Sequence, residues 1–202
     1  MPHETFFNLP SDKRQKIENI LLETFYHQPL SQVKVSDIVT KMKISRGAFY
    51  KYFVDLEDAN RYMISQSARK VHIKIMRYIC NSEEDLFLGI NQFLLEMTLK
   101  SPEDPNRMIL SFLTKSDHLL ISKRRKTPSE STMFQAWFDI LEKNQLWIDN
   151  ETEAISFLYF IMALVIQAWN DYIANDWSSE QLIEDLSFKM KWLREGLNQK
   201  KK

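Results

Sequence analysis

The stretch VKVSDIVTKMKISRGAFYKYF, residues 33–53, decides the fold of the N-terminal part of this chain. Apolar residues between Val35 and Met42 share one face of a short helix of about eight residues. A second helix of about seven residues follows after three residues, and its Phe49 and Phe53 are placed to face a core. Two short helices with so tight a connection are typical of a helix-turn-helix motif, whose second helix enters the major groove of DNA.

Gly47 lies in the first turn of this second helix and is one of only three glycines in the chain. Glycine costs a helix interior about 1 kcal/mol relative to alanine, so its presence needs a reason. In a helix that reads DNA, the missing side chain lets the backbone come close, and the exposed N–H groups and the helix dipole favour anions. The alternative is that Gly47 permits two helices of the protein to pack closely, and the sequence leaves both readings open.

The residues around Gly47 carry groups that bind DNA. Ser45 can cap the helix and donate to a phosphate, and the forked guanidinium of Arg46 can donate to O6 and N7 of guanine. Tyr50, Lys51 and Tyr52 supply hydroxyl and ammonium donors for phosphates. In the alternative reading, the two tyrosines are ordinary aromatic residues at the rim of a core.

The composition favours an all-α protein. Hydrophobic residues make up 44% of the chain and charged residues 27%, and only three glycines and six prolines occur in 202 residues. Strand-like alternation is not evident, and we expect about nine helices. Helix-start signals occur at Ser11, at Asp55 with Asp58, at Ser82, at Asp104 with Pro105, at Thr127 with Pro128, at Asn150 with Glu153 and at Ser178 with Gln181.

The sequence predicts a cytoplasmic protein without a membrane partner. One cysteine, Cys80, fits a reducing compartment, and no apolar signal segment opens the chain. The apolar run 154–169 is shorter than the roughly 20 residues of a membrane span, so we expect a buried helix.

Charge is unevenly distributed although the whole chain is neutral. Residues 1–53 hold eight Lys or Arg and five Asp or Glu, a net charge of +3, and the remainder carries −3. This asymmetry points to an anionic partner for the N-terminal end. We expect the basic run 123–126 to be a solvated loop, and the alternative is a second contact with an anion.

Signatures of an enzyme or a cofactor site were not found. The chain lacks a glycine-rich phosphate loop, a Gly-x-Ser-x-Gly elbow and a His-Glu-x-x-His motif. His72, Met76 and Cys80 share one helix face, where soft metals or haem could bind, but a packed face is the commoner reason for such a stripe. We therefore predict neither a catalytic activity nor a metal or other cofactor.

The stretch VSDIVTKMKISRGAFYKYFVDLEDANRYMI, residues 35–64, resembles the N-terminal domain of TetR-type transcriptional repressors, and the resemblance extends over residues 11–64. It implies a helix-turn-helix DNA-binding domain over residues 1–54 and a helical effector-binding and dimerisation domain over residues 55–202. It further implies a homodimer that binds a palindromic DNA operator as a repressor and is released by a small-molecule effector. The alternative is a TetR-like protein that acts through a protein partner.

By position, the resemblance implies a set of DNA contacts at Lys34, Ser36, Arg46, Gly47, Ala48, Tyr50, Lys51 and Tyr52, to which the reading of the residues themselves adds Ser45. Three positions depart from the family pattern. HQPLSQ stands where a glycine and an aromatic residue usually follow the first helix, and Lys34 replaces a threonine. Leu56 replaces a lysine that usually binds phosphate, so that contact is in doubt.

Two further regions follow from the resemblance. An effector pocket needs aromatic and aliphatic walls. Its candidates, for each of which singly a place in the core is the favoured alternative, are His72, Met76, Phe93, Met97, Phe112, Trp137, Phe138, Leu141, Phe160, Met162 and Gln167. The last two helices are expected to form the dimer interface as a four-helix bundle. The residues expected there are Ile155, Leu158, Tyr159, Ile161, Leu164, Val165, Trp169, Leu182, Leu186, Met190, Leu193 and Leu197.

Overall fold

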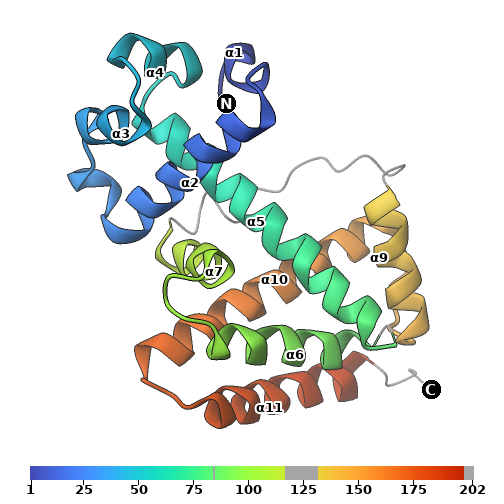
Figure 1. Ribbon diagram of the computed structural model, residues 1–202. Helices are drawn as coiled ribbons and strands as arrows, with labels where there is room; N and C mark the ends of the chain where they lie inside the picture. Colours follow the sequence, from blue (N-terminus) through green and yellow to red (C-terminus); the bar gives the residue numbers. More distant parts are fainter. Residues whose placement is uncertain (84, 117–131, 198–202) are drawn as a thin grey trace. The chain divides into compact units, whose positions relative to one another are not determined.

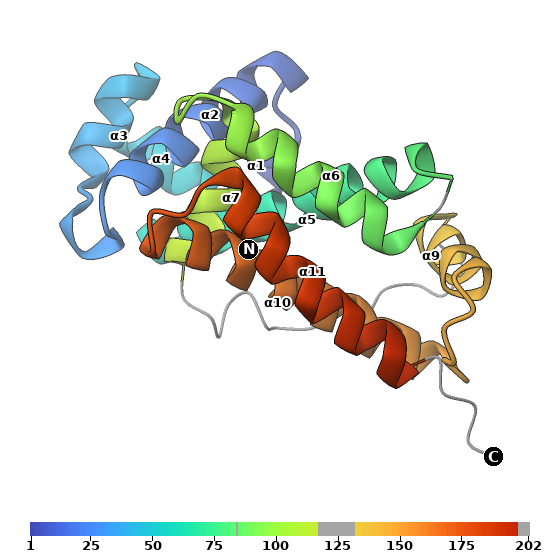
Figure 2. The ribbon, with the colours of Figure 1, turned by 90° about the horizontal axis from the view of Figure 1, so that it is seen from below.

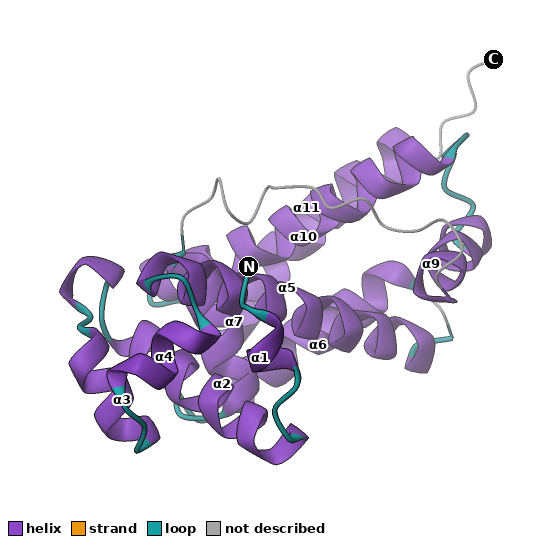
Figure 3. Ribbon diagram, turned by 90° about the horizontal axis from the view of Figure 1, so that it is seen from above, coloured by secondary structure: helices purple, strands orange, loops and turns teal. Residues whose placement is uncertain are grey.

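The computed structural model describes residues 1–83, 85–116 and 132–197, and all regular structure in these ranges is helical (Figure 3). The predicted all-α class is confirmed. The chain divides into two compact units, one of residues 1–69 with 102–121 and one of residues 70–101 with 122–202. The division into domains at residue 54 stays a prediction.

The first unit contains the predicted helix-turn-helix (Figure 1). Its elements are α1 (Glu4–Phe7), α2 (Ser11–His27), the short 3-10 helix η1 (Leu30–Gln32), α3 (Val35–Met42), α4 (Arg46–Tyr52), the first part of α5 (Leu56–Asn81) and α7 (Pro105–Lys115). Helix α2 packs against α3 and α7, and α4 packs against α1 and α3. The core between them is apolar, with Leu21, Ile38 and Phe49 fully buried.

The turn between α3 and α4 has the geometry of a helix stop followed by a helix start. Lys43 adopts the left-handed conformation at φ 55°, and the Ile44 N–H donates to the Val39 carbonyl at 3.0 Å, which ends α3. The Ser45 hydroxyl oxygen then accepts the Ala48 N–H at 3.1 Å and caps α4. Both the tight connection and the serine cap are as predicted.

Most of the other predicted helix starts are confirmed by their capping bonds. Carboxylate, amide or hydroxyl oxygens of Asp55, Asp104, Asn150 and Ser178 each accept a backbone N–H within the next three residues. The start predicted at Thr127 and the basic run 123–126 lie outside the described residues.

The start predicted at Ser82 is wrong, because Ser82 ends the preceding helix. Its N–H and its hydroxyl both donate to the Tyr78 carbonyl, and Glu83 follows at φ 55°. Asp85 caps the next helix instead, accepting the N–H groups of Phe87 and Leu88.

The second unit is built from the remaining helices (Figure 2). These are the end of α5, α6 (Leu86–Leu99), α9 (Thr132–Lys143), α10 (Glu151–Ala174) and α11 (Ser179–Leu197). Helix α10 packs against α6, α9 and α11. The Trp137 indole N–H donates to the Ala154 carbonyl at 2.9 Å and ties α9 to α10, and the Lys189 ammonium, 3.2 Å from the Asp171 carboxylate, ties α11 to α10.

Gly89 allows α6 to approach α5 closely. A Cβ atom at this position would lie 2.5 Å from the Ile79 Cα atom and 2.6 Å from its backbone nitrogen. Since the obstructing atoms belong to the backbone, any side chain at Gly89 would force the two helices apart.

Helix α10 is long and apolar enough, by length and composition alone, to cross a membrane. In this structure it lies among α6, α9 and α11, where Phe157, Val165 and Trp169 are buried. Its apolar composition is therefore accounted for by a place in the core, as predicted for 154–169.

Candidate nucleic-acid interface

Helix α4 has one buried face and one open face. Phe49 is fully buried, whereas Arg46, Gly47, Tyr50 and Lys51 are exposed. Ala48 and Tyr52 are half-buried at the edge between the two faces. The first turn and the open face are therefore available to a partner outside the protein.

Gly47 is not required by the packing of the protein. A Cβ atom built on it would meet only the Ser45 hydroxyl oxygen, at 3.8 Å, which is an ordinary van der Waals distance. Its φ angle is also not in the left-handed region. The reading in which Gly47 permits close packing of two helices within the chain is thus wrong, and Gly89 fills that role elsewhere.

Positive charge gathers on α3, α4 and the turn between them. Lys34, Lys41, Lys43, Arg46 and Lys51 are all exposed, and Asp37 is the one acidic residue between positions 33 and 53. Lys41 lies 4.0 Å from the Glu23 carboxylate, a distance at which an exposed pair is weak. No described carboxylate lies within ion-pair distance of the other four side chains, so their charges face solvent.

The remaining predicted contacts lie at the start of α3. Lys34 is the residue before the helix, and its side chain makes no capping bond. Ser36 is half-buried, and its hydroxyl donates to the Asp37 carboxylate at 3.0 Å. The structure therefore brings α4 and the start of α3 together in one unit, while the DNA-binding role of each residue stays a prediction.

Sequence reasoning missed the segment that precedes α2. This segment contacts the end of α4 through the backbone of His3 and the hydroxyl of Thr5. Its Phe6 side chain is fully buried. The only signal in the sequence is the apolar pair Phe6–Phe7 ahead of the Ser11 helix start.

Residues 85–197 match the family model described as "Tetracyclin repressor-like, C-terminal domain". This match spans more than half of the chain. The chain belongs to the TetR family of transcriptional regulators. No curated protein matches its sequence.

Solved TetR-family structures share the fold at low sequence identity. A regulator from Pectobacterium atrosepticum aligns with a TM-score of 0.57 at 13% identity, over 94% of this chain and 97% of that one. SCO4454 from Streptomyces coelicolor gives 0.55 at 10% identity, over 94% and 97%. Reduced NemR from E. coli gives 0.54 at 16% identity, over 90% and 97%. Such identities establish the fold alone.

TetR-family regulators bind small molecules as well as DNA. Of the predicted pocket residues, Phe93, Met97, Phe112, Trp137, Leu141 and Met162 are buried, His72, Met76 and Phe138 are half-buried, and Phe160 and Gln167 are exposed. Phe112 belongs to the first unit and the others belong to the second. Phe138 and Leu141 both line an open hollow of about 420 Å³ along α9.

The His72–Met76–Cys80 face of α5 is not uniform. Burial lowers the pKa of His72 to about 4, so its imidazole is neutral at pH 7. Cys80 is exposed at the other end of the stripe. Among the described residues, no group of three or more His, Cys, Asp or Glu side chains is placed to hold a metal ion.

TetR-family regulators are usually dimers, and both α10 and α11 expose large apolar residues. The large apolar residues exposed on these helices are Phe160, Ile173, Phe188 and Trp192. Half of the residues predicted for the interface are instead buried in the chain's own core, namely Ile161, Val165, Trp169, Leu182, Leu186 and Met190, and the side chain of Leu197 lies outside the described part of the structure. Because their side chains already contact neighbouring helices, they are not available to a second chain.

Proposed function

We propose that this TetR-family protein binds a palindromic DNA operator as a homodimer, represses transcription in the cytoplasm and is released by a small-molecule effector. It acts by binding and not by catalysis. The observation that carries the proposal is the empty outer side of Gly47, because a glycine that no protein contact requires fits close approach by an external partner. The exposed cations around it favour a polyanion as that partner.

The groups on α4 suit two different kinds of DNA contact. Arg46, at the first position of the helix, has a forked guanidinium that matches the O6 and N7 atoms of guanine in the major groove. Lys51, five residues further along α4, is suited to a phosphate. The Ser45 oxygen caps the helix by accepting a hydrogen bond, which leaves its own O–H free to donate to a phosphate.

A homodimer places two such helices at successive major grooves of a two-fold symmetric site. The exposed aromatic residues Phe160, Phe188 and Trp192 support an interface on α10 and α11, because a lone subunit leaves their apolar area in water. An effector that moves the population from about 1:99 to 99:1 between two states needs about 5.5 kcal/mol of differential affinity.

The test is a mobility shift of the purified protein with DNA from its own upstream region, over a salt series and against random competitor DNA. We expect binding as a dimer that weakens steeply with salt, because each neutralised phosphate contributes a slope of about −0.9 to the dependence of log K on log salt. Arg46→Ala should cost about 1–3 kcal/mol and relax the preference at one base pair per half-site. Lys51→Ala should weaken binding equally on all sequences and flatten the salt slope.

Arg77→Ala is the matched control, since it removes an exposed cation from the second unit. Its affinity and salt slope should equal those of the wild type. If Arg46→Ala lowers the affinity equally for every DNA sequence, Arg46 does not contact a base specifically. Salt-insensitive or absent binding by the wild type would overturn the proposal in favour of a TetR-like protein that acts through a protein partner.

A further inference from the structure

Helix α4 is too short to hold its own conformation. It has seven residues, whereas isolated helices below about 12–15 residues are marginal in water. The last four carbonyl groups of a helix also lack partners within it. The Phe53 N–H satisfies one of these by donating to the Phe49 carbonyl at 2.9 Å.

The N-terminal segment supplies partners for two more of these carbonyls. The His3 N–H donates to the Tyr52 carbonyl at 2.9 Å, and the Thr5 hydroxyl donates to the Lys51 carbonyl. Lys51 and Tyr52 are the residues whose side chains are proposed to bind phosphates. The segment therefore holds the backbone from which these two side chains project.

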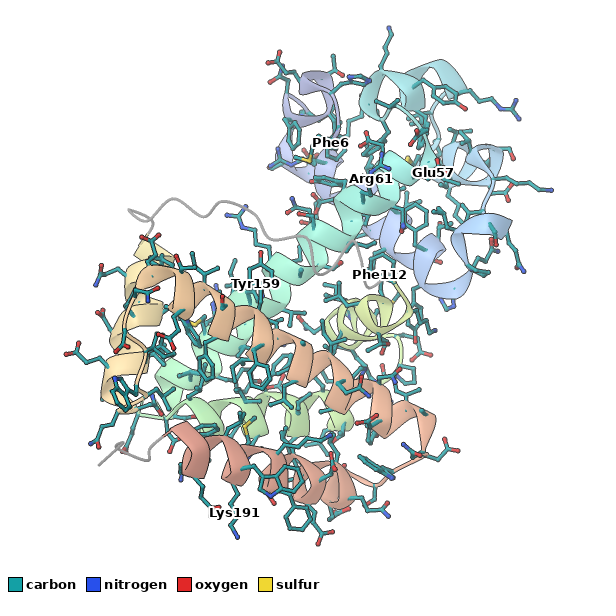
Figure 4. The ribbon with its side chains drawn as sticks, turned by 180° about the vertical axis from the view of Figure 1, so that it is seen from behind. Phe6, Glu57, Arg61, Phe112, Tyr159 and Lys191 are labelled. Carbon is teal, nitrogen blue, oxygen red and sulfur yellow. The ribbon has the colours of Figure 1, made fainter. Side chains whose placement is uncertain are left out.

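Phe6 anchors the same segment in the core of the first unit. Its side chain is fully buried, with its ring centroid 4.9 Å from that of Phe53 and 5.2 Å from that of Tyr62. The Tyr62 hydroxyl in turn donates to the buried Glu18 carboxylate of α2 at 2.6 Å. Figure 4 shows Phe6 beside the first turns of α5, which carry Glu57 and Arg61. The anchor thus rests on Tyr62 of α5 as well as on Tyr52 and Phe53 at the end of α4.

We propose that residues 3–6 form a clasp that positions the recognition helix α4 for DNA. Phe6 fixes the clasp to α5, and the two hydrogen bonds from His3 and Thr5 transmit that fixed position to the end of α4. Thr5 and Phe6 are positioning residues, because one has its hydroxyl engaged with the α4 backbone and the other is buried. The effect of the clasp on operator affinity rests on the proposed function, whereas its effect on α4 itself does not.

Thr5→Val tests the clasp with little disturbance of shape, since a methyl group replaces the hydroxyl of an exposed residue. A net hydrogen bond of ordinary strength corresponds to about a twofold to tenfold change in an equilibrium. We expect amide hydrogen exchange in the peptide that covers α4 to accelerate by that factor. Operator affinity, measured where the protein is fully folded, should fall by a similar factor.

Thr114→Val is the matched control, because the Thr114 hydroxyl donates to the Ser111 carbonyl within α7, a helix that packs against α2. It should leave both α4 exchange and operator affinity unchanged. The unfolding midpoint should be measured for both variants. A general loss of stability would lower the midpoint and change α4 exchange and operator affinity with it, whereas a local effect changes α4 exchange with little change in the midpoint.

Phe6→Leu provides a second variant that keeps an apolar side chain but loses the ring contacts with Phe53 and Tyr62. It should also accelerate exchange in α4. Unchanged α4 exchange in both Thr5→Val and Phe6→Leu would overturn the clasp, whether or not the protein binds DNA. Accelerated exchange in a protein that binds no operator would support the clasp and overturn the proposed function alone.

Discussion

Replacement of Gly47 by alanine should change stability and DNA affinity in opposite directions. Within the protein the added methyl group meets only the Ser45 hydroxyl oxygen at 3.8 Å, so no steric cost arises. Alanine loses less conformational freedom than glycine in a helix, and the free energy of unfolding should rise by about 0.5–1 kcal/mol. If the backbone of Gly47 touches DNA, the same methyl group intrudes on a close contact, which costs about 1–3 kcal/mol or roughly a 5- to 150-fold loss of affinity.

Urea unfolding and operator titration of the same preparations measure the two quantities. Gly196→Ala serves as the control, because no atom lies within 4 Å of a Cβ atom built at that position. It should be neutral or slightly stabilising and leave DNA affinity unchanged. A Gly47→Ala protein that binds the operator as tightly as the wild type would refute close approach at Gly47, and a destabilised one would refute the account of its packing.

Three further predictions concern the second unit. Gly89→Ala should destabilise the chain by about 1–2 kcal/mol in urea unfolding, since the strain against the Ile79 backbone outweighs the gain in helix propensity; an unchanged midpoint would contradict the close approach of α5 and α6. Burial lowers the pKa of His72 to about 4, so between pH 6.5 and 4 the unfolded chain binds a proton that the folded chain does not. The free energy of unfolding should therefore fall by about 2 kcal/mol between about pH 7.5 and 5. His72→Gln should remove this part of the pH dependence. Trp192→Glu should yield a folded monomer in sedimentation equilibrium, because Trp192 is 66% exposed in the single chain; a persistent dimer would place the interface elsewhere.

The helix-turn-helix could be predicted from the sequence because its determinants are local. The apolar spacing of α3, the serine cap of α4 and the carboxylate cap of α5 each act within one or two helical turns. The left-handed conformation of Lys43, which the sequence analysis did not predict, ends α3 within the three residues that precede α4.

The clasp could not be predicted in this way because its determinants are distant in sequence. Helix α1 has four residues, too few for a periodic pattern. Its partners are the carbonyls of Lys51 and Tyr52 and the ring of Tyr62. Composition also gives no reason to expect a short polar segment with one buried phenylalanine to be ordered.

The proposed dimer interface shows a different limit. Some apolar residues of α10 and α11 belong to the core of the chain and others are exposed, and the sequence pattern alone cannot separate the two sets. A helix with one apolar stripe buries that stripe in the core of the folded chain. Large apolar residues outside the stripe stay exposed unless another molecule covers them. In α10 the core takes Val165 and Trp169, and in α11 it takes Leu186, which leaves Phe188 and Trp192 without cover. The exposed apolar residues of α10 and α11 can be identified only after the core residues are known. Exposed aromatic residues such as these often contribute most of the binding energy in protein interfaces. The interface is therefore to be sought at the residues that the core leaves exposed and not at the most apolar stretch of the sequence.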